Sequence, residues 1–223
     1  IEQILLIVGY KKEQIHDYYK DGSEYNVKIT YTEQKEFLGT GDATNLAKSF
    51  ASGDPIILVY GDLFVDSKVL SIMINNFKKD ASQGAIIARE VLDPTKYGIL
   101  KQNHENYLEE IVEKPADDRF GNLANAGIYI LPPEIFPTLN GIPKSPRGEY
   151  ELTDGITKLV NQGIDFRIID ISKYFWSDLG HPWQLLDATK SLMQYLPGKP
   201  VSKTNFPAAT IINNGGVVEE FVT

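Results

Sequence analysis

The segment from Gln34 to Ala43 reads Gln-Lys-Glu-Phe-Leu-Gly-Thr-Gly-Asp-Ala and lies between a predicted strand and a predicted helix. Its glycines, Gly39 among them, would let a ligand approach the backbone, and the helix N-terminus presents free N–H groups to an anion. The side-chain amide of Gln34 could donate to one carbonyl of uracil or thymine and accept from the ring N–H. The alternative is that Thr40 or Asp42 only caps the helix.

Two aspartates occupy positions where a metal ion could bind. Asp62 follows Tyr60 and Gly61 just beyond the apolar strand Ile-Ile-Leu-Val. Asp178 lies in Trp-Ser-Asp-Leu-Gly-His-Pro, again after an apolar strand. In open α/β sheets ligands bind beyond the carboxyl ends of the strands, and two carboxylates with phosphate oxygens suit Mg²⁺. Each aspartate taken alone is equally an ordinary turn residue.

A charged pair ends the predicted strand 107–113. Glu113 and Lys114 precede a proline, which stops a strand because it cannot donate to the ladder. The carboxylate suits sugar hydroxyls and the ammonium suits a phosphate, so the pair matches a phosphorylated sugar. A solvated ion pair at a strand end is the ordinary alternative.

Two further segments combine glycine with polar side chains. Asn125-Ala-Gly-Ile-Tyr129 places Gly127 inside a strand pattern, which indicates either close approach of a ligand or a simple bulge. Gly-Glu-Tyr-Glu-Leu-Thr-Asp, at 148–154, places Glu151 beside a helix start, where it could bind a ligand or only cap the helix.

The elements that would position these residues alternate along the chain. The hydrophobic pattern predicts strands at 4–8, 27–32, 55–60 and 84–89, with helices at 11–19, 42–50 and 67–79 between them. This alternation predicts an α/β fold with a doubly wound, mostly parallel sheet. Shorter strands at 98–102, 107–113 and 126–131 predict an antiparallel part, followed by a helix at 152–161, a strand at 166–171 and a helix at 182–196.

The composition is that of a folded domain with an acidic balance. The chain has 223 residues, 42% hydrophobic and 23% charged, and a formal net charge of -8. An acidic surface disfavours nucleic acid, because binding a phosphate backbone needs cationic surface. The absence of cysteine excludes a thiolate metal site or nucleophile. With no apolar stretch long enough for a membrane helix, we expect a cytoplasmic protein without a membrane partner.

The two ends of the chain are expected to be incomplete. A buried-type strand at 4–8 opens the sequence, which predicts a fragment with exposed apolar surface. Residues 1–197 are predicted to form one domain, and 198–223 a connector followed by the first coil of a β-solenoid. One coil cannot stand alone, so the carboxyl end is also expected to continue.

Taken in this order, the segments resemble the sugar-1-phosphate nucleotidylyltransferases across almost the whole chain. The Leu-Gly-Thr-Gly, Tyr-Gly-Asp and Glu-Tyr-Glu-Leu-Thr-Asp segments resemble N-acetylglucosamine-1-phosphate uridylyltransferases. Glu-Lys-Pro and Trp-Ser-Asp-Leu-Gly resemble glucose-1-phosphate thymidylyltransferases. A long form with a carboxyl-terminal left-handed β-helix, sometimes bifunctional as an acetyltransferase, is similar in both respects. The resemblance implies a Rossmann-like nucleotidyltransferase sheet with an antiparallel sugar-binding part.

The resemblance also implies the reaction: a sugar-1-phosphate attacks UTP or dTTP with Mg²⁺ present, and pyrophosphate leaves. It assigns residues to four roles, which are base and nucleotide binding (Gln34, Gly39, Thr40, Tyr60, Gly61), phosphate binding (Lys114), sugar binding (Gly98, Glu113, Asn125, Gly127, Glu151) and metal binding (Asp62, Asp178). Asp62, Lys114 and Asp178 would be the catalytic set. A homo-oligomer, trimeric through the β-helix, is the implied assembly.

One departure from the family pattern limits the expected activity. The family's Gly-Gly-x-Gly-Thr-Arg loop is absent from this sequence, so we expect the 223-residue chain to be weakly active or inactive. Three other readings stay open: a non-catalytic regulatory subunit of the same fold, a metal-dependent glycosyltransferase, and an acyltransferase working through the solenoid. The sugar, and the choice between UTP and dTTP, are also open.

Overall fold

The computed structural model describes residues 1–193. The predicted connector and β-solenoid coil at 198–223, and the predicted end of the last helix at Leu196, lie outside the described residues. Within the described part, no helix combines the length and apolar character needed to cross a membrane.

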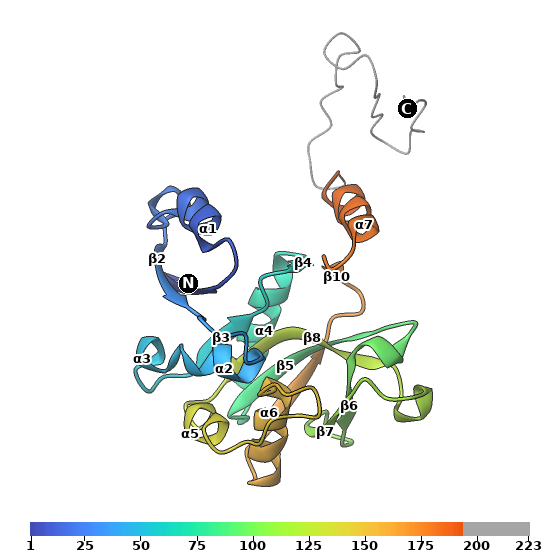
Figure 1. The fold of residues 1–223 in the computed structure, drawn as a ribbon. Helices are drawn as coiled ribbons and strands as arrows, with labels where there is room; N and C mark the ends of the chain where they lie inside the picture. Colours follow the sequence, from blue (N-terminus) through green and yellow to red (C-terminus); the bar gives the residue numbers. More distant parts are fainter. Residues whose placement is uncertain (194–223) are drawn as a thin grey trace, which may run out of the picture. The chain divides into compact units, whose positions relative to one another are not determined.

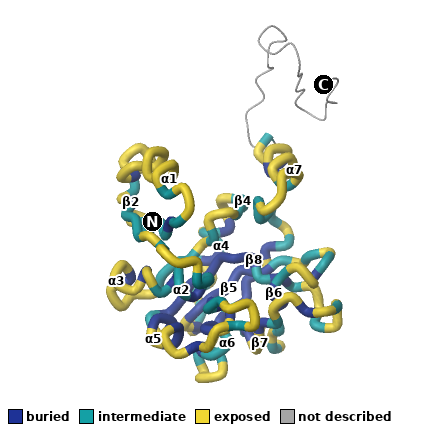
Figure 2. Tube along the Cα trace, in the orientation of Figure 1, coloured by how far each residue is buried: buried dark blue, intermediate teal, exposed yellow. Residues whose placement is uncertain are grey.

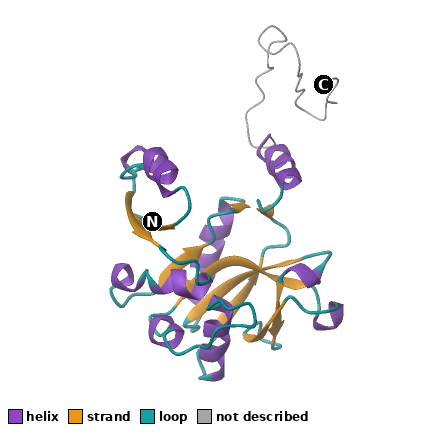
Figure 3. Ribbon diagram, in the orientation of Figure 1, coloured by secondary structure: helices purple, strands orange, loops and turns teal. Residues whose placement is uncertain are grey.

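Figure 1 shows the order of the elements and Figure 3 their type. The strands are β1 Gln3–Val8, β2 Lys28–Glu33, β3 Ile56–Val59, β4 Leu63–Val65, β5 Gly84–Glu90, β6 Gly98–Gln102, β7 Leu108–Glu113, β8 Leu123–Leu131, β9 Phe166–Asp170 and β10 Trp176–Asp178. The α-helices are α1 Lys12–Tyr19, α2 Thr40–Asn45, α3 Lys48–Ala51, α4 Lys68–Lys79, α5 Ile135–Leu139, α6 Leu152–Asn161 and α7 Pro182–Met193. Short 3₁₀ turns are η1 Ser23–Tyr25, η2 Pro94–Lys96 and η3 Asp118–Phe120.

A six-stranded sheet forms the centre of the fold. Its strand order is β7-β6-β8-β5-β9, and β3 also pairs with β8. Strands β5 and β9 are parallel, whereas β8 runs antiparallel to β3, β5 and β6, and β7 runs antiparallel to β6. Strands β3, β5, β6 and β9 therefore share one direction. The predicted α/β class, with one prevailing strand direction and an antiparallel second half, is confirmed.

The core lies on both faces of this sheet. Along β5, Ile86 and Ala88 join a buried cluster with residues of α5 and α6. The alternate residues Ala85 and Ile87 are also fully buried and face the other side, where α4 packs on β5 and β9. In Figure 2 these central strands are the main buried part of the chain. Burial on both faces makes this sheet a rigid support for the side chains at its ends.

The first strand differs from its prediction. Strand β1 pairs in parallel with β2 in a separate two-stranded sheet, and only Val8 of β1 is buried. Leu5 and Ile7 are partly buried and pack against the core cluster. The expectation of a fully buried strand at 4–8 was therefore wrong, because on the described residues this strand has a single strand partner.

The predicted helix at 42–50 is two short helices. Helix α2 ends at Asn45 and α3 begins at Lys48. Between them Leu46 and Ala47 donate to carbonyls three residues back, at 3.1 and 3.0 Å, so the chain tightens locally to a 3₁₀ pattern. The Thr44 hydroxyl also bonds the carbonyl of Thr40 at 2.7 Å, a side-chain bond that competes with regular helix.

The chain divides into two compact units. Among the described residues, the first comprises 1–61 and 67–174, and the second comprises 62–66 and 175–193. In the second unit, β4 and β10 form an antiparallel pair that the sequence did not predict, with Leu63 opposite Asp178. The proposed boundary at 197 remains a prediction. The two units are described separately below.

Candidate functional site

The glycine-rich segment packs against the chain at Tyr150. The N–H of Gly41 donates to the Tyr150 carbonyl at 2.8 Å, and the Tyr150 N–H donates to the Leu38 carbonyl at 2.7 Å. Gly39 has φ 108°, and a Cβ there would lie 2.6 Å from the Tyr150 oxygen. Glycine is thus required at this position by a second backbone, quite apart from any ligand.

Gln34 is oriented by this segment. Its amide nitrogen donates to the Gly39 carbonyl at 3.1 Å and to the Asp42 carboxylate at 2.9 Å. Both amide protons are therefore used within the protein, and the amide oxygen is the atom that remains for a ligand. The two-way match expected from the sequence would also need a free amide N–H, which these two bonds use.

Thr40 does not cap its own helix. Gly39 occupies the N-cap of α2, and neither Thr40 nor Asp42 makes a capping bond there. Instead the Thr40 hydroxyl accepts from the N–H of Leu152 at 3.0 Å and so satisfies the amino end of α6. The Thr40 side chain also lies close enough to that of Tyr60 to lower the pKa of the phenol, against the larger effect of burial. The expectation that Thr40 or Asp42 caps α2 was therefore wrong. Thr40 satisfies the amino end of a different helix, α6.

A chain of side-chain hydrogen bonds continues from Tyr60 into β8. The Tyr129 hydroxyl donates to that of Tyr60 at 3.3 Å, and the Asn125 amide donates to the Tyr129 hydroxyl at 2.7 Å. The two rings meet edge to face, with centroids 5.8 Å apart. Burial raises the pKa of Tyr60, and it raises the pKa of the fully buried Tyr129 still further. Both phenols therefore act as neutral hydrogen-bonding groups.

Gly127 forms a bulge in β8. It has φ 75°, and the pairing with β5 shifts between Ile86 and Ala88 at the point where Gly127 lies. Its N–H donates to the Asn125 side-chain oxygen at 3.1 Å, and its carbonyl accepts from the N–H of Tyr60 at 3.1 Å. The bulge alternative is therefore correct, and the bulge orients Asn125.

Gly98 and Glu113 face each other across the β6–β7 hairpin. They are paired in register, and a Cβ on Gly98 would lie 2.9 Å from the Glu113 Oε2 atom and 3.8 Å from Asn125 Cβ. Desolvation raises the pKa of Glu113, opposed by the nearby charges of Arg147 and Lys114. Gly98 is therefore the residue that leaves room for the Glu113 carboxylate.

Arg147 connects two carboxylates and was missed by the sequence analysis. Its Nη2 atom lies 2.9 Å from Glu151 Oε1 and 3.7 Å from Glu113 Oε1. Glu151 is buried, at 7% exposure, and also accepts from the Ser145 hydroxyl at 3.1 Å. A surface arginine has no spacing signal of its own. Only its place between two acidic residues that are distant in the sequence gives it a role.

These residues lie together in the first unit, and we call them the site cluster: Thr40, Tyr60, Tyr129, Asn125, Gly98, Glu113, Arg147 and Glu151. Most of its members were predicted as ligand-binding residues from separate segments. Lys114 follows Glu113 directly with an exposed side chain and φ 44°. The first unit therefore brings the predicted sugar-binding residues and two of the nucleotide-binding residues together.

The two predicted metal ligands both belong to the second unit. Asp178 ends β10, opposite Leu63, and the Leu179 N–H donates to the Asp62 carbonyl at 2.7 Å, so the two aspartates occupy neighbouring positions of a strand pair. One oxygen of Asp178 accepts from the Gln184 amide at 2.6 Å. Among residues 1–193, no group of three or more histidine, aspartate or glutamate side chains could hold a metal.

The sheet and the site cluster together define a Rossmann-like α/β domain of the nucleotidyltransferase type. Residues 1–195 match the family model described as nucleotidyl transferase, and the chain belongs to this family. It is 35% identical over 224 residues to the bifunctional protein GlmU of Methanococcus maripaludis, covering 98% of this chain and 51% of that protein.

A second relative and a solved structure are also similar to this chain. The bifunctional sugar-1-phosphate nucleotidylyltransferase/acetyltransferase of Sulfurisphaera tokodaii is 35% identical over 190 residues, covering 85% of this chain and 44% of that protein. The fold is similar to that of a UTP-bound UGPase from Acinetobacter baumannii, with a TM-score of 0.70, 22% identity, and coverage of 88% of this chain and 79% of that one. The chain spans about half the length of the curated relatives it matches.

Proposed function

We propose that this chain provides the body of an enzyme that transfers a nucleotidyl group from UTP or dTTP to a sugar-1-phosphate, giving a nucleotide sugar and pyrophosphate. The family membership supports nucleotidyl transfer. The observation that carries the proposal is the site cluster, because it brings together residues that were predicted separately for the nucleotide and for the sugar.

The proposed roles follow from the contacts. Gln34 offers its amide oxygen to the N–H of a uracil or thymine base, beside the backbone of Gly39. Glu113 and Asn125 accept and donate toward the sugar hydroxyls, while Gly98 and Gly127 set their positions. Thr40, Tyr60 and Gly61 belong to the nucleotide side of the proposed site, and Glu151 supports the sugar side through Arg147.

Asp62 and Asp178 fit the coordination chemistry of Mg²⁺. This ion is commonly held by one or two carboxylates, with substrate phosphates and water completing the shell, and not by an all-protein cage. Asp62 directly precedes β4, and Asp178 ends β10 opposite Leu63, so the two carboxylates lie one position apart along this strand pair. A bound Mg²⁺ would neutralise charge on the triphosphate.

The chain's own residues then bind and orient the reactants. An oxygen of the sugar phosphate forms a bond to the α-phosphorus of the triphosphate, the bond to the bridging oxygen breaks, and pyrophosphate leaves with that oxygen. Lys114 supplies positive charge for the phosphates. Arg147 also does so when its contact with Glu151 is broken. Catalysis is by positioning and charge stabilisation, without a covalent intermediate.

We also propose the partners, the cellular location and the assembly of the protein. The partners are a nucleoside triphosphate and a sugar-1-phosphate, with no nucleic acid or membrane, in the cytoplasm. The proposed assembly is a homo-oligomer, trimeric through a left-handed β-helix. The lack of a Gly-Gly-x-Gly-Thr-Arg segment in this sequence leads us to expect weak or no turnover by the 223-residue chain itself.

The test is pyrophosphate release with Mg²⁺, UTP or dTTP and a panel of sugar-1-phosphates. The 223-residue chain is compared with a version preceded by a family glycine-rich first unit. We expect release from the second version and at least a 100-fold loss in its Asp62→Asn variant, since removal of one group that stabilises transition-state charge typically costs about 10²–10³ in rate.

The matched control is Asp54→Asn, which alters an exposed aspartate outside the predicted site. It should retain the rate of the unmodified chain. If neither version releases pyrophosphate while both bind a nucleotide sugar, the regulatory-subunit reading replaces the enzymatic one. Equal rates in Asp62→Asn and Asp54→Asn would remove the proposed metal role.

A further inference from the structure

The β6–β7 hairpin carries site residues at one end and a turn at the other. Gly98 and Glu113 pair at the open end, next to Lys114, whose N–H donates to the Tyr97 carbonyl at 3.0 Å. The hairpin joins the rest of the sheet through one backbone pair, Ile99 with Ala124. Its buried residues Leu100, Leu108 and Ile111 pack into the core, and α6 packs against β7.

The turn of the hairpin reaches the edge strand β9. Tyr107 forms an isolated antiparallel bridge with Arg167, and the Ile168 N–H donates to the Asn106 carbonyl at 2.9 Å. The Tyr107 hydroxyl donates to Asp80 Oδ1 at 2.8 Å, just beyond the end of α4. The hairpin is therefore held along its length by β8 and α6, and its turn is attached separately to β9 and to the end of α4.

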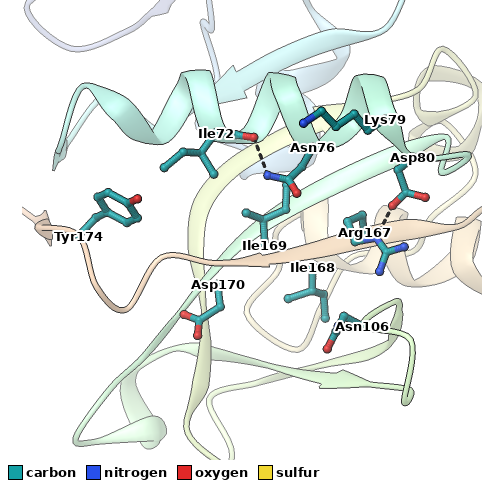
Figure 4. Close-up of a pocket in the computed structure, with 10 residues that line it drawn as sticks. All are labelled: Ile72, Asn76, Lys79, Asp80, Asn106, Arg167, Ile168, Ile169, Asp170 and Tyr174. Atoms are coloured by element: carbon teal, nitrogen blue, oxygen red, sulfur yellow. Dashed lines mark hydrogen bonds and ion pairs between the residues drawn. The ribbon is translucent and has the colours of Figure 1, made fainter.

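Arg167 completes this attachment with side-chain contacts. Its Nε atom donates to Asp80, its Nη1 atom donates to the Glu105 carbonyl, and its guanidinium lies over the Tyr107 ring, 4.0 Å from the centroid. The side chains of Asp80 and Arg167 are 13% and 24% exposed. Figure 4 shows the pair at one end of a pocket of about 600 Å³ that α4, β9 and the hairpin turn line.

We propose that Asp80, Tyr107 and Arg167 form a lock that sets the angle of the β6–β7 hairpin and so positions Gly98 and Glu113 for the sugar. This inference rests on the proposed function of the site cluster. The three residues are positioning residues, because none of them contacts that cluster in the described structure. The hydrogen bond to Arg167 lowers the pKa of Asp80 to about 2, so the lock stays ionised at any physiological pH.

A displacement of the hairpin turn would change the angle of the hairpin enough to affect binding at its open end. With a strand rise of roughly 3.3 Å per residue, the turn lies about 13 Å from the Ile99 pair. A displacement of the turn by about 3 Å would rotate the hairpin by about 13°, which is within the 10–20° at which binding geometry fails. Loss of a single contact at the turn should therefore weaken sugar binding at the open end.

The experiment uses Tyr107→Phe and Asp80→Asn in the full 223-residue chain. Tyr107→Phe removes one hydrogen bond and keeps the ring under Arg167, and Asp80→Asn removes the charge and keeps an acceptor. Dissociation constants for N-acetylglucosamine-1-phosphate, glucose-1-phosphate and UTP are measured by calorimetry with Mg²⁺. We expect both variants to weaken sugar-phosphate binding about 5- to 20-fold and to change UTP binding by less than about twofold, since the site residues on the two hairpin strands, Gly98 and Glu113, are both assigned to the sugar.

The matched control is Glu110→Gln, which breaks an exposed ion pair with Lys101 in the same hairpin and leaves the lock intact. It should bind both ligands as the unmodified chain does. A parallel loss of sugar phosphate and UTP in the lock variants, or no loss of either, would overturn the proposal. The split between the two ligands is the signature that a general loss of stability would not produce.

Failure of the proposed function is distinguishable from failure of the lock. If the unmodified chain binds no sugar-1-phosphate, the proposed function is wrong at this site, and the lock is judged by hydrogen exchange of the amides at 98–102. Faster exchange there in Tyr107→Phe than in Glu110→Gln, with unchanged exchange in α6, would support the lock. Equal exchange in the two variants would overturn it.

Discussion

The negative charge of Glu113 favours the proposed sugar binding but lowers the stability of the folded chain. Its side chain, 37% exposed, is only partly desolvated beside Gly98, and Arg147 at 3.7 Å offsets part of that effect, so the pKa of Glu113 in the folded chain is raised above its ordinary value and the effect on stability should be small. A carboxyl group with a raised folded pKa binds its proton more tightly in the folded state. Stability therefore falls as pH rises from the unfolded-state pKa through the folded one.

Glu113→Gln tests this balance. The neutral amide keeps the shape and removes the charge, so at pH 7 we expect the melting temperature to equal or exceed that of the unmodified chain, and at pH 4 the difference should shrink. Sugar-phosphate binding should weaken at both pH values, because the amide cannot replace both carboxylate acceptors. Thermal denaturation at the two pH values and calorimetry check these results.

The comparison for this prediction is Glu109→Gln, which changes an exposed glutamate on the same strand for which no role is proposed. It should leave melting temperature and binding unaltered. A clear drop in melting temperature at pH 7 in Glu113→Gln would mean that the Arg147 contact outweighs desolvation, and the argument from the raised pKa would be wrong.

At the scale of an element, the bulge in β8 decides where the site side chains lie. An L-residue with a side chain is strained at the φ of 75° that Gly127 adopts. We expect Gly127→Ala to reduce the free energy of unfolding by about 1–2 kcal/mol, from the left-handed conformation alone. The same change should also disturb Asn125, which accepts from the Gly127 N–H, and should weaken sugar binding. Urea denaturation and calorimetry measure the two effects.

Gly163→Ala separates backbone strain from site geometry. Gly163 has φ 89°, a Cβ there would have nothing within 4 Å, and the residue lies outside the site cluster. It should lose a similar amount of stability and keep its sugar binding. If both variants keep their binding, the bulge at Gly127 supports the fold and not the site.

At the scale of the whole molecule, charge limits the partners. The sequence carries 30 acidic and 22 basic residues, and a formal charge of -8 makes association with a phosphate backbone unfavourable. We expect no retention of the chain on immobilised double-stranded DNA or RNA at 150 mM salt, while a single nucleotide still binds through local contacts. Retention that falls steeply with added salt would contradict this expectation and reveal a cationic face.

Patterns in the sequence were enough to predict the fold class, the family and most of the residues that the structure brings together in the site cluster. Hydrophobic periodicity is a local property, so alternating strands and helices could be predicted without contacts. The glycine, Glu-Lys-Pro and Asn-Ala-Gly segments could likewise be recognised one at a time. Each had an ordinary structural alternative, and their joint occurrence in one order favoured a ligand site.

Only the tertiary structure decided which groups meet. The bond from Leu152 to Thr40, the pairing of Gly98 with Glu113 and the bridge through Arg147 join residues that are far apart in the chain. Sequence patterns report which face of an element is apolar, but not the register or angle at which two elements pack. For the same reason Gly39 could be predicted to approach something closely, whereas the structure shows that Tyr150 is the partner, because close approach is set by packing and not by residue type.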